Sequence, residues 1–136
     1  MIYLSLGDIW RKIADAFVNN LIVEDRYMMI VDGLETTLII TVLAALLGTI
    51  LSGGICWMRM SSHKWFREIA RVYIELMRGT PVLVLLLLMY YVIMAPTNAS
   101  GVSVAIVTFA MNTSAYMAEM LRSGIEGIEI GQTEAG

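Results

Sequence analysis

The chain has 136 residues, of which 58% are hydrophobic and only 15% are charged. Soluble domains of this length carry nearer to a quarter charged residues, and their cores rarely need uncharged stretches as long as 36–58 and 79–118. About 20 apolar residues cross a bilayer as a helix, so these stretches supply one span and two spans. The sequence predicts an all-α, polytopic transmembrane protein, and the net charge of -3 adds little because the placement of charges matters more than their sum.

Residues 1–32 form an N-terminal segment ahead of the predicted membrane domain, 33–136. Residues 9–22 place apolar side chains on one side of a helix and charged or amide side chains largely on the other. That pattern favours an amphipathic helix in the membrane interface. A helix packed against the rest of the protein is an equal alternative. Acidic residues and Trp10 interrupt the segment, which argues against a cleavable signal peptide.

The first predicted span covers residues 34–58, and Asp32 with Glu35 resembles a capping box at its start. Small residues recur every four positions at Ala44, Gly48 and Ser52, which forms a narrow strip that lets another helix approach closely. The one cysteine, Cys56, lies near the end of this span and is expected to be a buried, unreactive thiol.

A basic connection, 59–78, follows this span and contains five Lys or Arg residues. Apolar residues from Trp65 to Met77 give it a second amphipathic stripe. Thr80 is a candidate N-cap, with Pro81 at the first helical position. The apolar stretch 81–95, however, is short, at about 22 Å as a helix. The second span is therefore predicted to cover 73–95, with Pro81 as a kink.

An uncharged turn, 95–101, separates this span from the third, 102–121, in which Ala110, Ser114 and Ala118 form another strip of small residues. Lys and Arg residues near span ends mark the cytoplasmic side. Since the connection 59–78 holds five and the turn none, the connection is expected to be cytoplasmic. The N-terminus then lies outside, and the stretch 123–136 lies inside the cell.

No catalytic constellation is present in the sequence, so the chain is not expected to be an enzyme. His63 is the only histidine, and with one cysteine it cannot assemble a zinc site. No Gly-Lys-Ser or Gly-Lys-Thr phosphate-binding loop occurs, so ATP would have to bind to another chain. The sequence predicts no metal, no bound cofactor and no nucleic-acid partner.

Polar residues inside the third span are the candidates for function, because such residues are costly in lipid and tend to face a bundle interior or a water-filled path. The candidate substrate path consists of Asn112, Ser114, Tyr116 and Glu119. Two alternatives stay open. Asn112 and Ser114 would instead bond between helices, and Glu119 would form an interfacial ion pair with Arg122, three positions along one face.

Three motifs, in order, make the chain resemble a known family. They are Gly33-Leu34 with Thr37-Leu38, the run Tyr73–Pro81 (YIELMRGTP), and the run Ala115–Ile125 (AYMAEMLRSGI) followed by Gly131–Gly136 (GQTEAG). The chain resembles the polar amino-acid permeases of ATP-binding-cassette (ABC) importers, the inner-membrane components of binding-protein-dependent transport systems. The resemblance implies the N-terminal part of a type I importer permease in a bacterial inner membrane.

The same resemblance implies how such a chain would work. In the family, the Glu-Ala-Ala motif begins a cytoplasmic coupling helix that docks on an ABC ATPase subunit. Here Gly131, Gln132, Glu134, Ala135 and Gly136 would take that part. The other expected partners are a substrate-binding protein outside the cell, a second permease subunit and the lipid bilayer. ATP and Mg would be used by the ATPase.

Two interpretations of the whole chain stay open. Because family members continue past this motif through about two further spans, the sequence is expected to be cut off within it. The first interpretation is a permease subunit of an amino-acid importer. The alternative is a truncated, non-transporting remnant or an assembly partner of full-length permeases.

Overall fold

The computed structural model describes residues 6–19 and 26–128, and every regular element in those ranges is a helix. The chain divides into two compact units, 1–38 and 39–136, which are described separately. In the first unit, α1 (Leu6–Phe17) confirms the expected N-terminal helix, although it begins three residues earlier. Its apolar side chains, among them Trp10 and Phe17, are exposed. Residues 20–22 of the predicted helix lie outside the described ranges.

The long helix α2 (Tyr27–Met60) contains the first predicted span. The capping-box prediction was wrong, since Asp32 and Glu35 lie inside the helix rather than at its start. Thr36 and Thr37 instead donate hydrogen bonds from their hydroxyl groups to backbone carbonyls four residues earlier, at 2.9 and 2.8 Å. These bonds satisfy polar side chains within the helix itself, as an apolar environment requires.

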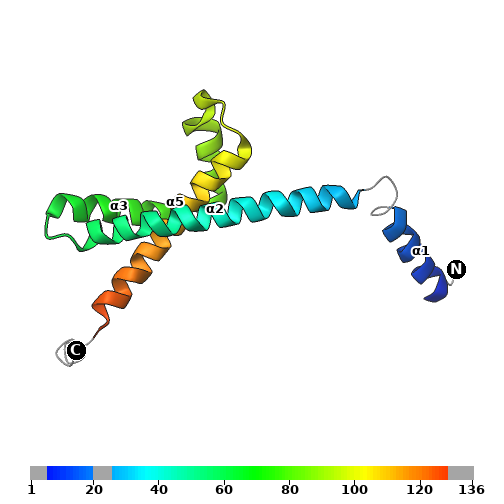
Figure 1. The fold of residues 1–136 in the computed structure, drawn as a ribbon, viewed down its shortest axis with the longest axis horizontal. Coiled ribbons are helices and arrows are strands. Elements are labelled where there is room, and N and C mark those ends of the chain that lie inside the picture. The colour runs from blue at the N-terminus through cyan, green and yellow to red at the C-terminus, as the bar shows by residue number, and fades with distance from the viewer. Residues whose placement is uncertain (1–5, 20–25, 129–136) are drawn as a thin grey trace. The chain divides into compact units, whose positions relative to one another are not determined.

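The expected second span, 73–95, is not one straight helix. The structure has α3 (Lys64–Gly79), then α4 (Val82–Leu88) continued by the π-helical turn η3 (Met89–Ile93), and the two parts are bent by 107° (Figure 1). Proline disfavours a helical conformation in the residue before it, and Thr80 is extended at φ -108° and ψ 131°. The Thr80 hydroxyl donates to the carbonyl of Leu76 at 2.9 Å, so the prediction that Thr80 caps the following helix was wrong.

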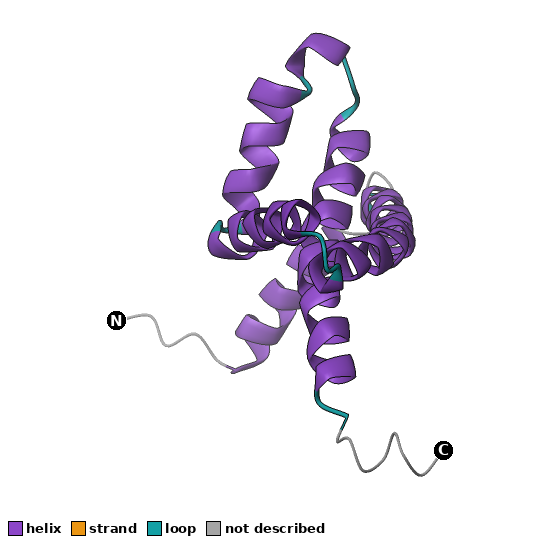
Figure 2. Ribbon diagram, turned by 90° about the vertical axis from the view of Figure 1, so that its left-hand side faces the viewer, coloured by secondary structure: helices purple, strands orange, loops and turns teal. Residues whose placement is uncertain are grey.

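The uncharged turn after η3 contains a short 3-10 helix, η4 (Ala95–Thr97), and leads into α5 (Gly101–Glu126). Asn98 takes the left-handed conformation at φ 51°, which reverses the chain. Ser100 is the N-cap of α5, and its side chain accepts a hydrogen bond from the backbone N–H of Ser103 at 3.2 Å. The α4–η3 segment and the first half of α5 form two arms joined by this turn (Figure 2).

Both predicted strips of small residues are buried at helix contacts. The buried residues of α2 are Ala44, Gly48, Ser52 and Cys56. Ala110, Ser114 and Ala118 are buried on α5. A Cβ atom added at Gly48 would lie 3.0 Å from the Thr113 Cβ and 3.1 Å from the Ala110 carbonyl oxygen. The two helix backbones therefore approach as closely as small residues allow, which is how helices associate in lipid.

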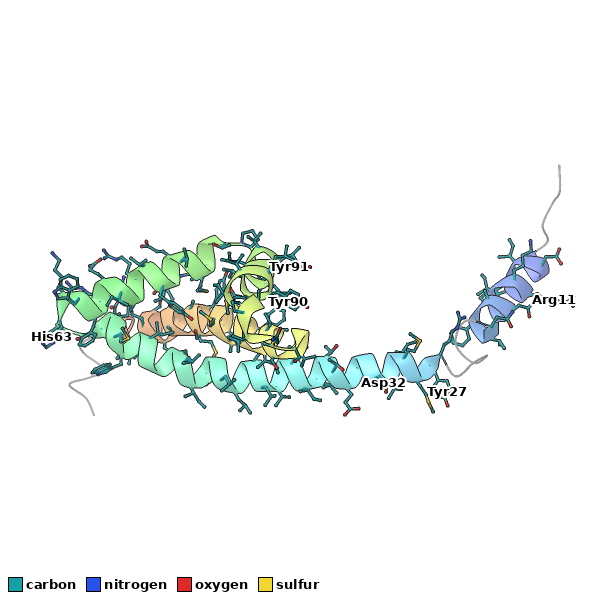
Figure 3. The ribbon with its side chains drawn as sticks, turned by 90° about the horizontal axis from the view of Figure 1, so that it is seen from above. Arg11, Tyr27, Asp32, His63, Tyr90 and Tyr91 are labelled. Carbon is teal, nitrogen blue, oxygen red and sulfur yellow. The ribbon has the colours of Figure 1, made fainter. Side chains whose placement is uncertain are left out.

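Helix α3 completes this core from the other side. His63 lies at the turn where α2 passes into α3 (Figure 3). Ile74 and Met77 of α3 then pack with Leu85 of α4 and with Ala115 and Ala118 of α5. The buried side of α3 thus consists of residues three and four positions apart, as expected for an amphipathic helix.

Two described helices, α2 and α5, are long and apolar enough to cross a membrane. The bent pair formed by α3 and the α4–η3 segment makes a third only if it is counted as one span. The chain is a helical, polytopic membrane protein.

Candidate functional site

Three of the four predicted path residues lie on one face of α5. Asn112, Tyr116 and Glu119 are separated by four and three positions, which brings them to the same side of a helix. Tyr116 is exposed, and Asn112 and Glu119 are half-buried. We call Asn112, Tyr116 and Glu119 the polar face.

Ser114 does not belong to the polar face, because it is buried on another side of α5. Its hydroxyl donates to the Met111 carbonyl at 2.7 Å and lies 2.9 Å from the Tyr73 hydroxyl. Tyr73 also bonds the Met111 carbonyl, at 2.9 Å. Of the two alternatives for Ser114, the bond between helices is the one present, and it ties α3 to α5.

Arg78, at the end of α3, contacts the polar face directly. Its guanidinium carbon lies 5.4 Å from the ring centre of Tyr116, within the range of a cation–π contact. This contact joins two of the recognised motifs, since Arg78 belongs to the run Tyr73–Pro81 and Tyr116 to the run Ala115–Ile125. It also brings a positive charge beside residues 101–118 of α5, which contain no charged side chain.

Glu119 is paired within its own helix. Arg122 bonds the Glu119 carboxylate through Nε at 3.1 Å and through Nη2 at 2.5 Å, and it also pairs with Glu126. The expected Glu119–Arg122 ion pair is therefore present. Both side chains of that pair are largely covered, at 23% exposed. Partial burial strengthens such a pair relative to an exposed one, because water and salt screen it less.

Around Glu119 the ends of three helices form a small charged pocket of about 160 Å³. The residues that line it are Arg59 of α2, Arg71, Ile74, Glu75 and Arg78 of α3, and Glu119 of α5. Sequence reasoning found Glu119 but missed its neighbours, because only folding brings α2 and α3 to it. The one sequence signal for these neighbours was Arg78, because it is the last charged residue before the uncharged stretch 79–118.

The arrangement is suited to binding rather than to bond chemistry. Guanidinium groups bind carboxylates, carboxylates bind ammonium groups, and the pocket offers both. In the described part of the chain, no three His, Cys, Asp or Glu residues are grouped so that they could hold a metal ion. The predicted coupling residues Gly131, Gln132, Glu134, Ala135 and Gly136 lie outside the described residues.

The described residues thus form apolar helices with charged groups gathered around Glu119. Residues 44–136 match the family described as binding-protein-dependent transport system inner membrane component. The chain belongs to this family, which consists of transport permeases rather than enzymes.

Curated relatives and a solved structure agree with this assignment. The chain is 35% identical over 112 residues to a probable amino-acid ABC transporter permease of Bacillus subtilis, and the match covers 82% of this chain and 50% of that protein. It is 32% identical to a putative glutamine permease of Rickettsia prowazekii, over 81% and 51% of the two chains. An amino acid ABC transporter crystallised with histidines superposes with a TM-score of 0.68 at 35% identity, covering 99% of this chain and 56% of that one.

The chain spans about half the length of the curated relatives that it matches. What is established is therefore the family and the helical membrane fold.

Proposed function

We propose that this chain belongs to the permease subunit of an ATP-driven, binding-protein-dependent importer of polar amino acids, and that it forms part of the translocation path. The observation that carries the proposal is the match to amino-acid permeases at 35% identity over 82% of the chain. The relatives reported above are named as transport permeases, which does not favour the alternative of a non-transporting remnant or assembly partner.

The polar face supports the same proposal from the side of chemistry. A free amino acid carries a carboxylate and an ammonium group, and both lose hydration inside a membrane protein. The charged pocket holds guanidinium groups from Arg59, Arg71 and Arg78 and carboxylates from Glu75 and Glu119. An amino acid that passes these groups would exchange water for ionic partners of both signs. Asn112 and Tyr116 continue the polar face along α5 beyond the charged pocket.

The proposal includes an orientation and a set of partners. The basic connection 59–78 faces the cytoplasm and the N-terminus lies outside a bacterial inner membrane, by the distribution of Lys and Arg. An ABC ATPase docks on the cytoplasmic side and uses ATP and Mg, and this chain binds no cofactor. A substrate-binding protein delivers the amino acid from outside, and a second permease subunit completes the path.

The test is reconstitution. The subunit would be co-expressed with an ABC ATPase and a substrate-binding protein from the same organism, purified through a tag on the subunit, and placed in vesicles with ATP inside. We expect the partners to co-purify and labelled polar amino acids to accumulate only when ATP and the binding protein are both present. A subunit that assembles with the ATPase but accumulates no amino acid would contradict the substrate class. Failure to bind any ATPase would contradict the importer itself.

A further inference from the structure

Helix α3 carries an apolar stripe that the protein leaves uncovered. Trp65, Ile69, Val72 and Leu76 are separated by four, three and four positions, so they form one continuous row along the helix. All four are exposed, and Trp65 reaches 83%. The buried contacts of α3 use a different row, Ala70, Ile74 and Met77. The exposed stripe is therefore not part of the core described above.

The beginning of the same helix concentrates positive charge and aromatic rings. Lys64 and Arg67 lie on either side of Trp65 in sequence in the first turn of α3, and the nearby carboxylate of Glu68 pairs with Arg71 at 3.2 Å. Trp57, at the end of α2, is exposed and its ring centre lies 6.2 Å from that of Phe66. Tryptophan side chains and basic residues gather in this way at the level of lipid headgroups.

The exposed apolar stripe and the basic beginning of α3 together favour the membrane interface as the environment in which this helix begins. Six of its 16 residues are charged, which excludes the hydrocarbon interior as the surroundings of the whole helix. A row of four exposed apolar side chains that includes a tryptophan disfavours bulk water. A helix that begins at the membrane surface satisfies both, because Trp65 enters the acyl boundary while the charges of the first turn stay among headgroups and water. Helix α3 runs beside the second half of α2, so its beginning lies at the same end of the bundle as the end of the α2 span (Figures 1 and 3).

We propose that the beginning of α3 lies in the membrane interface and binds acidic phospholipid headgroups through Lys64 and Arg67, with Trp65 inserted just below them. The excess of basic residues near Trp65 is the reason for choosing an acidic lipid over a protein partner as the occupant. Juxtamembrane Lys and Arg residues attract anionic lipids at close range, and salt weakens the attraction. The proposal depends only on the chain being a membrane protein, and not on its transported substrate.

Fluorescence quenching by brominated lipids tests this proposal. The full chain, with Trp10→Phe and Trp57→Phe so that Trp65 is the only tryptophan, is placed in vesicles of equal parts phosphatidylglycerol and phosphatidylcholine. In one preparation the first lipid carries bromine high on its acyl chain, and in the other the second lipid does. We expect Trp65 to be quenched in both, and the relative affinity for phosphatidylglycerol to be at least about threefold, falling toward one in high salt.

A matched pair of variants identifies the source of the preference. Lys64→Gln with Arg67→Gln removes two charges beside Trp65 and is expected to abolish most of the lipid preference while Trp65 stays quenched. Arg11→Gln with Lys12→Gln removes the same charge from α1 and should leave the preference unchanged. Absence of quenching by either lipid would show that protein covers Trp65 and would overturn the proposal. Equal quenching by the two lipids at low salt would overturn the assignment to acidic headgroups.

Discussion

Single residues decide how closely the helices of this protein approach, and Gly48 is the clearest case. Its missing side chain leaves room for Thr113 and for the carbonyl of Ala110 on α5. Gly54, on the same helix, has no neighbour within 4 Å of the place where a Cβ atom would be built. The two glycines look alike in the sequence, but only one of them lies at a helix crossing.

This difference predicts a matched pair of outcomes. Gly48→Leu should destabilise the protein by about 1–3 kcal/mol, the usual cost of adding bulk to a closely packed site. Gly54→Leu should change stability by less than about 0.5 kcal/mol, as expected for an exposed position. The measurement is the loss of monodisperse protein on heating in detergent, followed by size-exclusion chromatography. Equal behaviour of the two variants would contradict the contact between α2 and α5.

The hydroxyl groups of Tyr73 and Ser114 form the polar link between α3 and α5. Hydrogen bonds between membrane helices contribute about 0.6 kcal/mol on average. A double-mutant cycle of Tyr73→Phe and Ser114→Ala should therefore show a coupling of about 0.5–1.5 kcal/mol in the free energy of unfolding. Each hydroxyl group has one proton and either can donate it to the Met111 carbonyl, so each single variant leaves that acceptor partnered. A coupling of zero would mean that the two hydroxyl groups do not bond each other in the membrane.

At the scale of elements, the break between α3 and α4 shapes the molecule more than any other feature. The sequence predicts one kinked span because the apolar stretch 81–95 is too short to cross a bilayer alone. The structure instead bends by 107° and gives α3 a direction of its own. The charged end of α3 thereby reaches Glu119, and its apolar stripe faces away from the core.

Spin labels on either side of the break measure it. Cysteines replacing Glu68 and Val92, with Cys56→Ala as background, would lie about 36 Å apart along a straight helix. With the observed bend we expect roughly 20 Å between the helix axes at those positions. Pro81→Ala restores a backbone N–H and should shift part of the distribution to longer distances. Pro96→Ala serves as the control and should not. A native distance near the straight value would disprove the bend.

At the scale of the whole molecule, the chain spans about half the length of the permeases that it matches, and α5 precedes the residues of the proposed ATPase contact. Arg122 forms ion pairs with both Glu119 and Glu126 on the last two turns of α5. The Ser123 hydroxyl also bonds the Glu119 carbonyl, at 2.8 Å. If the proposed ATPase docks beyond α5, these bonds would help the helix end to pass on its movement.

The coupling prediction concerns Glu134, whose position in the docking motif follows from the family resemblance. Glu134→Lys in the complete subunit should lower amino-acid uptake by about tenfold or more, because reversing a charge at a protein interface costs several kcal/mol. ATP hydrolysis by the assembled complex should continue without the normal stimulation by binding protein. Glu129→Lys, a charge reversal on the same stretch, provides the comparison. Normal uptake by a well-expressed Glu134→Lys protein would contradict the coupling role.

The sequence alone determined the class of this protein, because the uncharged stretches 36–58 and 79–118 admit little besides membrane helices. It also determined the family through its three motifs, and it located the small residues Gly48, Ala110 and Ser114 at helix contacts. These conclusions depend on local properties: hydropathy, helical spacing and residue size.

Only the tertiary structure decided which polar residues share a site. Ser114 and Glu119 belong to the same predicted span, yet one bonds to Tyr73 and the other lies beside Arg59 and Arg78. Spacing on α5 gives the side on which each residue lies, but it cannot say which helix packs against that side. The extent of the break at Pro81 was equally hidden, because a proline allows either a slight kink or a sharp turn, and the structure has a bend of 107°.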